Sequence, residues 1–482
     1  MNDSAHHQRT QDATGNRMRV VISGMDCVTP LGDDASLAAH LHHGTPPFMP
    51  APVLPGAAWC PVNAFDPAQA TDHWRHRRYL SRGGLFALAS ALGAARDAGW
   101  GASAPDGAAL VTAHGPNLDI TSDFPHCHCD VSGTGDTQGD APSPCATSTH
   151  GGPTAAHGVN GMNGVDGPDE ARHGLSRDTA GLDHPGLDAL WLLRWLPNTA
   201  ASAIAQRLGI HGEGLVVGTA CAAGLQALGE AYRRVRHGLA PTVLAAGGDS
   251  RLSAGGMLGY ARADALWHSN ARPASHAEAL RAMRPFDAAH GGFVPGEGGA
   301  AFVLETEAAA CARGATIHGE ILGFGATLDG ASLTAPDATA HHAECAVRKA
   351  LDDAGFTPGD IAWVAAHGTS TPRGDAAEAL LLQRVFTDAG HRPAVTALKS
   401  WTGHLASACG LAECALMLRA ARCGVLPSIR NLDTPCSPAA EGLDLVREPR
   451  PFPQGPGLIQ SFGFGGQNAA LIVMPAVTRA GQ

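Results

Sequence analysis

One cysteine stands where a thiol could act as a nucleophile. The stretch VVGTACAAGLQALGEAYRRVRHG, residues 216–238, begins as a buried strand and continues as a helix, and Cys221 lies at the join. The free N–H groups and the dipole of a helix N-terminus lower the pKa of a thiol, which reacts only as the thiolate. A lone cysteine in this setting is more often a packed structural residue. The case for a nucleophile therefore depends on the other groups that the chain supplies.

Three further segments could supply those groups. His367 follows a buried strand and opens the loop HGTSTPRGD, and active sites of open α/β sheets gather at the ends of such strands. KSWTGH places Lys399 five residues before His404, and SFGFGGQNAA (461–470) is a glycine-rich loop between two strands. Any one of the 25 histidines is an ordinary residue by default, so the argument rests on the combination.

The composition excludes several classes of protein. With 482 residues, 44% hydrophobic and 16% charged, the chain is of globular type. Its net charge of -11 argues against general nucleic-acid binding. No apolar run reaches membrane-spanning length, and the polar N-terminus lacks the apolar middle of a signal peptide. Twelve cysteines form no CxxC pair, which is typical of a reducing compartment. We therefore expect a cytoplasmic protein that binds neither nucleic acid nor membrane.

Strand and helix patterns alternate along the chain in two rounds. The first round comprises residues 18–32, 82–99, 107–115, 214–220, 240–250 and 299–314; the second comprises 315–330, 343–355, 361–369, 406–424 and a closing hairpin at 458–474. This alternation predicts an α/β fold with buried mixed sheets and helices in layers, and its repetition predicts two related halves.

The halves are predicted to divide near residue 310. We assign 18–310 to the half with the cysteine and 311–476 to the half with the two histidines, between a disordered leader (1–17) and a tail (477–482). Residues 116–186, rich in Gly, Asp, Ser, Thr, Pro and His, are predicted to be a flexible insertion. Its HCHC stretch matches no structural zinc spacing, so we predict no metal.

Six motifs, in order, resemble those of the elongating β-ketoacyl-acyl-carrier-protein synthases, which have the thiolase fold. They are ISGMDCVTPLG, GTACAAG, RPFDAAHGGFVPGEGGA, AHGTSTPRGD, KSWTGH and SFGFGGQN. They cover nearly the whole chain outside the insertion. The resemblance implies a decarboxylative condensation, in which Cys221 holds an acyl group while malonyl-carrier loses CO2 and its enolate attacks the thioester. It implies that His367 and His404 stabilise the enolate oxygen through Nε2, and that the backbone N–H groups of Cys221 and Phe464 form an oxyanion hole.

The resemblance also implies supporting roles. Lys399 and Glu378 match a buried ion pair behind the histidines, with a surface salt bridge as the plainer alternative. Glu297 matches a buried structural carboxylate. Phe464 matches a gate that swings aside to admit the acyl chain, or is otherwise an ordinary core residue. The remaining loop residues are the flanking glycines of the gate, Gly463 and Gly465, and a second mobile loop with Asp329 and Thr334.

Partners follow from the same resemblance. The arm that carries the substrate, phosphopantetheine, arrives on the carrier protein, so no cofactor of the enzyme's own is expected. Carrier proteins are acidic, and WRHRRYLSRGG offers a basic docking surface at Arg75, Arg77, Arg78 and Arg82, unless these are merely solvated. Large apolar residues at 190–196 suit either an acyl pocket or the contact of a homodimer or of a heterodimer with a related subunit.

Three departures from the family pattern leave the substrate open. Ala365 stands where Asn is common, Ser332 where His is common, and Gln467 where Thr is common. None removes a catalytic group, but each could alter the pocket or the loops. Fatty-acid elongation and, favoured here, a specialised polyketide or polyene pathway both fit. A non-catalytic scaffold subunit is the alternative from another functional class.

Overall fold

The computed structural model describes residues 18–32, 36–37, 39–40, 44–118 and 190–476, and every structural statement below concerns these residues. The predicted leader, the tail and the insertion from residue 119 onward, with its HCHC stretch, lie outside them. In the described chain no helix is both long and apolar enough to cross a bilayer.

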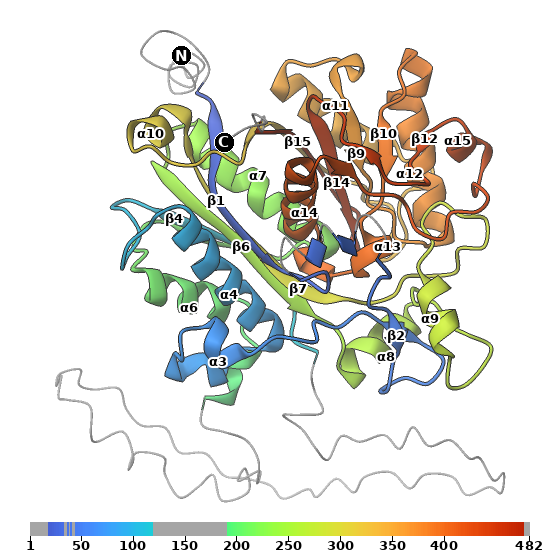
Figure 1. Cartoon of the computed structure of the whole chain (residues 1–482), viewed down its shortest axis with the longest axis horizontal. Helices are drawn as coiled ribbons and strands as arrows, with labels where there is room; N and C mark the ends of the chain where they lie inside the picture. The colour runs from blue at the N-terminus through green and yellow to red at the C-terminus, as the bar shows by residue number, and fades with distance from the viewer. Residues whose placement is uncertain (1–17, 33–35, 38, 41–43, 119–189, 477–482) are drawn as a thin grey trace, which may run out of the picture. The chain divides into compact units, whose positions relative to one another are not determined.

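A mixed sheet of eleven strands runs through the described part of the chain (Figure 1). In spatial order its strands are β12 (Asp444–Leu445), β10 (Ala394–Thr396), β9 (Trp363–Ala365), β14 (Gly457–Gly463), β15 (Gln467–Pro475), β8 (Gly319–Leu328), β1 (Val20–Val28), β7 (Glu297–Thr306), β6 (Thr242–Ser250), β4 (Ala109–Ala113) and β5 (Gly214–Val217). Two small pairs stand apart, β2 (Met49–Pro50) with β3 (Ala58–Trp59), and β11 (Val425–Leu426) with β13 (Arg450–Pro451).

The strand arrangement repeats on the two sides of the sheet. From β1 outward, the pairings with β7, β6, β4 and β5 are antiparallel, antiparallel, parallel and parallel. From β8 outward, the pairings with β15, β14, β9 and β10 follow the same series. Strands β1 and β8 join the two runs through an antiparallel contact, with Val20 opposite Ile321. The predicted α/β fold with two related halves is confirmed. The predicted boundary at residue 310 falls inside α10 (Glu307–Ala312) and stays a prediction.

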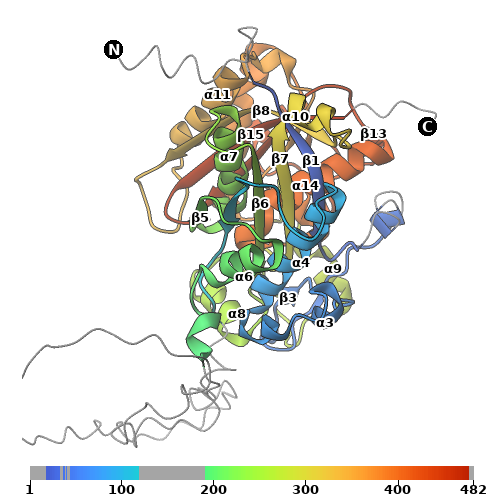
Figure 2. The same cartoon turned by 90° about the vertical axis from the view of Figure 1, so that its left-hand side faces the viewer.

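Helices cover both faces of this sheet (Figure 2). The longer ones are α4 (Arg82–Asp97), α6 (Thr199–Leu208), α7 (Ala223–Arg236), α8 (Ala254–Arg262), α9 (His276–Ala282), α11 (His341–Ala354), α12 (Pro372–Val385) and α14 (Cys409–Cys423); the short ones are α3 (Pro67–Ala70), α13 (Lys399–Thr402) and α15 (Pro438–Glu441). One apolar cluster joins α7 and α14 to strands of both halves. A second cluster packs α4 and α6 on the first half, and a third packs α11 and α12 on the second.

The starts of α7 and α14 lie against each other at the centre of the fold. A Cβ added at Gly224 would be 2.8 Å from the Ser407 carbonyl oxygen, and one added at Gly410 would be 2.6 Å from the Leu225 backbone nitrogen. Only glycine allows this approach. The crossing brings the segment with the cysteine in one half next to the segment with His404 in the other.

Candidate active site

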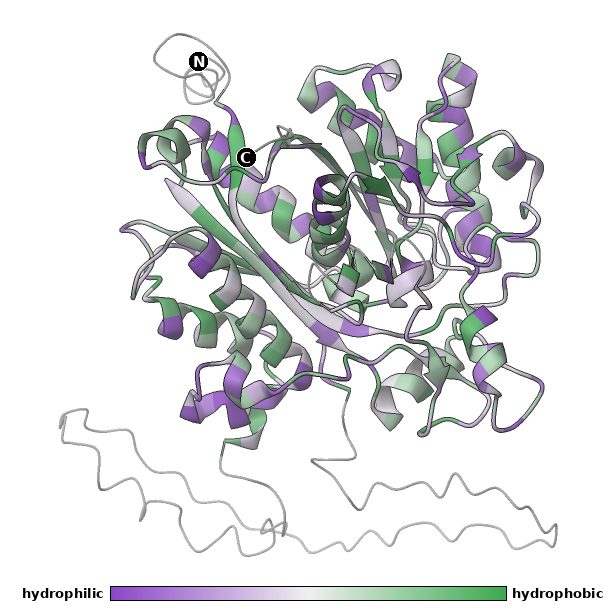
Figure 3. Ribbon diagram, in the orientation of Figure 1, coloured by the Kyte–Doolittle hydropathy of each residue, from purple (hydrophilic) through white to green (hydrophobic). Residues whose placement is uncertain are grey.

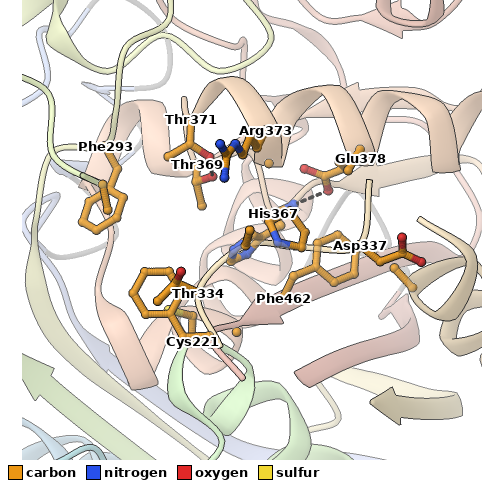
Figure 4. Close-up of a pocket in the computed structure, with 18 of the residues that line it drawn as sticks. Cys221, Phe293, Thr334, Asp337, His367, Thr369, Thr371, Arg373, Glu378 and Phe462 are labelled. Atoms are coloured by element: carbon orange, nitrogen blue, oxygen red, sulfur yellow. Dashed lines mark hydrogen bonds between the residues drawn. The ribbon is translucent and has the colours of Figure 1, made fainter. Parts of the chain in front are cut away.

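A cavity of about 300 Å³ opens where the two halves meet (Figure 4). It brings together groups that are far apart in the sequence. Of the predicted site residues, its wall contains Cys221, Asp329, Thr334, His367, Glu378, His404, Gly463 and Phe464. Lys399 lies fully buried behind this wall.

Cys221 sits in a tight turn between β5 and α7. The turn begins with Ala220 at φ 49°, a left-handed conformation that costs a non-glycine residue free energy and is found preferentially at functional sites. The same turn recurs before α14, where Ala406 has φ 48°. Cys221 itself is 8% exposed.

The thiol differs from the expectation in its acidity. Burial raises the pKa of Cys221 to about 11, while the Lys399 ammonium and the Phe464 backbone N–H act in the opposite direction. We expected the helix N-terminus to lower the pKa of this thiol. That expectation was wrong, because loss of hydration around the sulfur outweighs the effects of the nearby cations and of the Phe464 N–H group.

His367 and His404 form a pair of neutral hydrogen-bond donors. Their rings lie 5.9 Å apart, edge to face at 87°. Burial, with the charge of Lys399 adding to it, holds the pKa of both imidazoles well below the usual range. The Lys399 ammonium lies 3.3 Å from His367 Nδ1 and donates to it. A neutral imidazole that accepts at Nδ1 carries its proton on Nε2, so His367 presents an Nε2–H donor.

His404 is held in the same tautomer by different groups. Its Nδ1 accepts from the backbone N–H of Ala406 at 2.9 Å and from the thiol of Cys409 at 3.2 Å. Both histidines therefore keep Nε2–H as their free donor. The contact between Cys409 and His404 was not expected from the sequence. Nothing in the KSWTGH segment indicates which residue contacts the imidazole ring.

The predicted Lys399–Glu378 ion pair was wrong. Lys399 Nζ lies 2.6 Å from Glu413 Oε1, with both side chains almost completely buried. Glu413 lies on α14, the helix that packs against the start of α7, and its side chain reaches Lys399 from there. The sequence did contain a signal for it, a single carboxylate within the apolar run CGLAECALML.

Glu378 instead holds the backbone of the first histidine loop. Its carboxylate accepts from the N–H groups of His367 (2.6 Å) and Gly368 (2.7 Å) and from the Gln460 side chain (2.7 Å). Burial raises the pKa of Glu378 to about 7 against the effect of the two backbone donors. Glu378 thus positions His367 without pairing with Lys399.

The glycine-rich loop lies over the nucleophile. A Cβ added at Gly463 would be 3.2 Å from the backbone nitrogen of Cys221, so the loop touches the nucleophile's own turn. Gly465 has φ +80° and its N–H donates to the Leu333 carbonyl at 2.8 Å. The Asp329 N–H donates to the carbonyl of Gly466 at 2.8 Å. The two loops that the sequence singled out are therefore joined by backbone hydrogen bonds.

The arginines of the predicted docking surface divide into two groups. Arg82 pairs with Glu297, which is 1% exposed and also accepts from Ser250. Glu297 is thus a buried structural carboxylate, and Arg82 is engaged by it. The others lie in the 3-10 helix Arg75–Tyr79, in a hydrophilic segment that follows α3 (Figure 3). Arg75 and Arg78 are exposed there.

Comparisons with known proteins agree with this geometry. Two family models match, "Beta-ketoacyl synthase, N-terminal domain" at residues 171–310 and "Beta-ketoacyl synthase, C-terminal domain" at residues 318–433. The 3-oxoacyl-[acyl-carrier-protein] synthase 2 of Coxiella burnetii is 35% identical over 57% of this chain and 65% of its own length. That of Vibrio cholerae is 36% identical over 58% of this chain and 67% of its own length. The alignments thus span about two thirds of these relatives.

Solved structures are similar over nearly the whole chain. A β-ketoacyl synthase from Burkholderia phymatum is 28% identical with a TM-score of 0.76, covering 95% of this chain and 100% of that one. The ishigamide ketosynthase/chain length factor is 25% identical with a TM-score of 0.74, covering 96% and 100%. The motifs, the repeated sheet and these matches lead to one conclusion: the chain belongs to the β-ketoacyl synthase family.

Proposed function

We propose that the chain catalyses the decarboxylative condensation of an acyl group held on Cys221 with a malonyl thioester carried by an acyl carrier protein. One observation carries the proposal. A thiol and two neutral imidazoles share one cavity, and both imidazoles have Nδ1 occupied and Nε2–H free. Such donors are suited to an oxygen that becomes negative only during the reaction.

In the first half-reaction the Cys221 sulfur attacks the carbonyl carbon of an acyl thioester. The new carbon–sulfur bond forms as the carrier thiol leaves, and the carrier thiol takes the proton that Cys221 gives up. The Lys399 ammonium and the Phe464 backbone N–H both lower the pKa of Cys221 and so favour the developing thiolate. With the pKa near 11, these groups act when the substrate is in place and the sulfur is already losing its proton.

In the second half-reaction malonyl-carrier loses CO2. The electron pair of the broken carbon–carbon bond enters an enolate, whose oxygen accepts from Nε2–H of His367 and His404. The enolate carbon then attacks the Cys221 thioester, and the backbone N–H groups of Cys221 and Phe464 hold the resulting oxyanion. Collapse releases the Cys221 thiolate, which takes a proton from water, and leaves a carrier-bound β-ketoacyl product that is two carbons longer.

Intact mass spectrometry with a panel of carrier-bound acyl groups tests this proposal. Wild type should gain one acyl mass, Cys221→Ala none, and addition of malonyl-carrier should discharge the acyl group as a β-ketoacyl product. Absence of an adduct on folded wild type with every donor would refute catalysis by this chain alone. That result would favour a non-catalytic scaffold subunit. An adduct that forms only in the presence of a related subunit would refute the scaffold role.

The partners belong to the proposal. We infer that an acidic carrier docks at Arg75, Arg77 and Arg78, since these basic side chains lie in an exposed hydrophilic segment. Replacing Arg75 and Arg78 by Glu should raise KM for carrier-bound acyl groups without changing the rate with a short synthetic thioester. We further propose a homodimer or a heterodimer with a related subunit through the apolar side chains at 190–196, of which Leu190 and Leu192 are more than half exposed.

The setting of the reaction also remains a proposal. The twelve cysteines form no CxxC pair, and Cys60, Cys221 and Cys414 are free buried thiols, which supports the reducing cytoplasm. No cofactor of the enzyme's own enters the steps above, because the carrier's arm supplies the thioesters. Between fatty-acid elongation and a specialised polyketide or polyene pathway we favour the latter, on the departures at Ser332, Ala365 and Gln467.

A further inference from the structure

Tyr260 is a polar residue of the cavity wall that takes no part in the steps above. Tyr260, on α8, lines the same cavity as Cys221 and His404. Its ring meets the ring of Phe293 edge to face, with centroids 4.9 Å apart at 83°. Phe293 in turn packs against the imidazole of His404 at 4.7 Å. The tyrosine is thus fixed in place, through one aromatic neighbour, beside the reacting groups.

The hydroxyl of Tyr260 has no hydrogen-bond partner among the described residues. Tyr232 offers the contrast within the same chain. Its hydroxyl donates to the Leu322 carbonyl at 3.2 Å or to Asp353 at 3.1 Å, and accepts from Arg236 at 2.5 Å. Tyr260 is half-buried, and its hydroxyl is not one of the enclosed polar atoms that lack a partner, so it is open to the cavity. No group of the described chain competes for this hydroxyl, which can therefore bind a substrate oxygen in place of water.

The hydroxyl stays protonated whenever the enzyme works. Burial raises the pKa of Tyr260 well above the usual range, and a negative charge on Cys221 raises it further. The same coupling shows that the hydroxyl and the sulfur lie in one electrostatic environment. A neutral phenol both donates and accepts, so it can bind either a carbonyl or a hydroxyl oxygen.

We propose that Tyr260 binds an oxygen on the carbon chain of the acyl group held by Cys221, and so selects β-hydroxyacyl or β-oxoacyl groups over saturated ones of equal length. This inference rests on the proposed function and specifies its substrate class. A site built to hydrogen-bond a substrate oxygen discriminates against an analogue that lacks it, because its own polar group is then left unpaired. A single neutral hydrogen bond predicts a preference of about 3- to 10-fold.

Competition between two carrier-bound thioesters, octanoyl and 3-hydroxyoctanoyl, tests the proposal. The two adducts on Cys221 differ in mass by one oxygen atom, so intact mass spectrometry gives their ratio directly. We expect wild type to favour the hydroxylated group by about 3- to 10-fold and Tyr260→Phe to bring the ratio close to one. Tyr232→Phe is the matched control, since it removes a hydroxyl outside the cavity, and it should keep the wild-type ratio.

Thermal unfolding supplies the second readout. Tyr260→Phe should unfold close to the wild-type temperature, whereas Tyr232→Phe should unfold at a lower temperature because it loses the hydrogen bonds of a buried hydroxyl. An unchanged adduct ratio in Tyr260→Phe, or a wild-type preference for octanoyl, would overturn the role of Tyr260 and leave the condensation intact. No adduct from either thioester on wild type would overturn both proposals.

Discussion

Lys399 is the residue whose removal should reveal most about the site. Its ammonium pairs with Glu413, donates to Nδ1 of His367 and lowers the pKa of Cys221. Lys399→Met keeps an unbranched side chain of nearly the same length and deletes all three interactions. The variant leaves Glu413 buried without its cation. Breaking one side of a buried ion pair costs about 3–5 kcal/mol in the free energy of unfolding.

The double variant Lys399→Met/Glu413→Gln separates structure from chemistry. Replacing both members of a buried pair with neutral side chains of similar volume is often neutral for stability, so most of the loss should be regained. The alternative double variant, Lys399→Met/Glu378→Gln, should regain far less, because the hydrogen bonds of Glu378 go to backbone N–H groups and its removal leaves Glu413 unpaired. Urea unfolding of the four proteins measures this.

The same proteins report on the thiol. All three variants that lack Lys399 should alkylate Cys221 more slowly at pH 8 than wild type, by tenfold for each unit that the pKa rises. A fifth protein, Glu413→Gln alone, keeps the cation and should not slow alkylation. Equal stability of the Lys399→Met single and the Glu413 double variant would refute the pairing. Equal alkylation rates with and without Lys399 would refute its action on the sulfur.

Three further predictions concern the same cavity. Alkylation of Cys221 by iodoacetamide should accelerate about tenfold per pH unit from 7 to 10, because its pKa is about 11; a plateau near pH 8 in the mass-spectrometric rates would contradict this. His367 and His404 have depressed pKa values when folded, so below pH about 6.5 the unfolded chain binds protons that the folded chain does not. Between pH 6.5 and 5, wild type should therefore lose up to about 1.4 kcal/mol per pH unit relative to His404→Gln in urea unfolding, and parallel curves would argue against a buried neutral imidazole. Gly463→Ala adds a Cβ 2.7 Å from the Thr219 carbonyl oxygen, in the turn before Cys221, and should slow acylation of Cys221 at least tenfold. The Cβ of the control variant Gly101→Ala meets nothing within 4 Å. Equal acylation rates in the two variants would mean that the glycine-rich loop does not contact the turn of Cys221.

The sequence singles out three residues that the structure brings into one cavity, Cys221, His367 and His404, because the place of each depends on local structure. Cys221 and His367 each stand at the end of a strand, and His404 follows a short fixed interval after Lys399, so their places follow from motif and element together. The fold class was accessible for a similar reason. The alternation of buried strands and helices is repeated, and the repeat reappears as two runs of strands with one order and one set of directions.

What the sequence could not supply are choices made by packing between distant elements. The sequence offers both Glu378 and Glu413 as partners for Lys399. Only the placement of α12 and α14 in the fold determines that Glu413 forms the ion pair. The acidity of Cys221 was misjudged for the same reason. A helix start is visible in the sequence, but the cavity wall that encloses the sulfur also includes Tyr260, Phe293 and Phe464, which are distant from Cys221 along the chain.

These corrections change how the site is understood. The chemistry needs a sulfur that can become negative and two imidazoles that must stay neutral. One buried cation serves both needs, because positive charge lowers the pKa of a thiol and of an imidazole alike. Glu413 pairs with this lysine, and Glu378 holds the backbone of His367. The two glutamates thus serve different groups, while the lysine acts on the thiol and on both imidazoles.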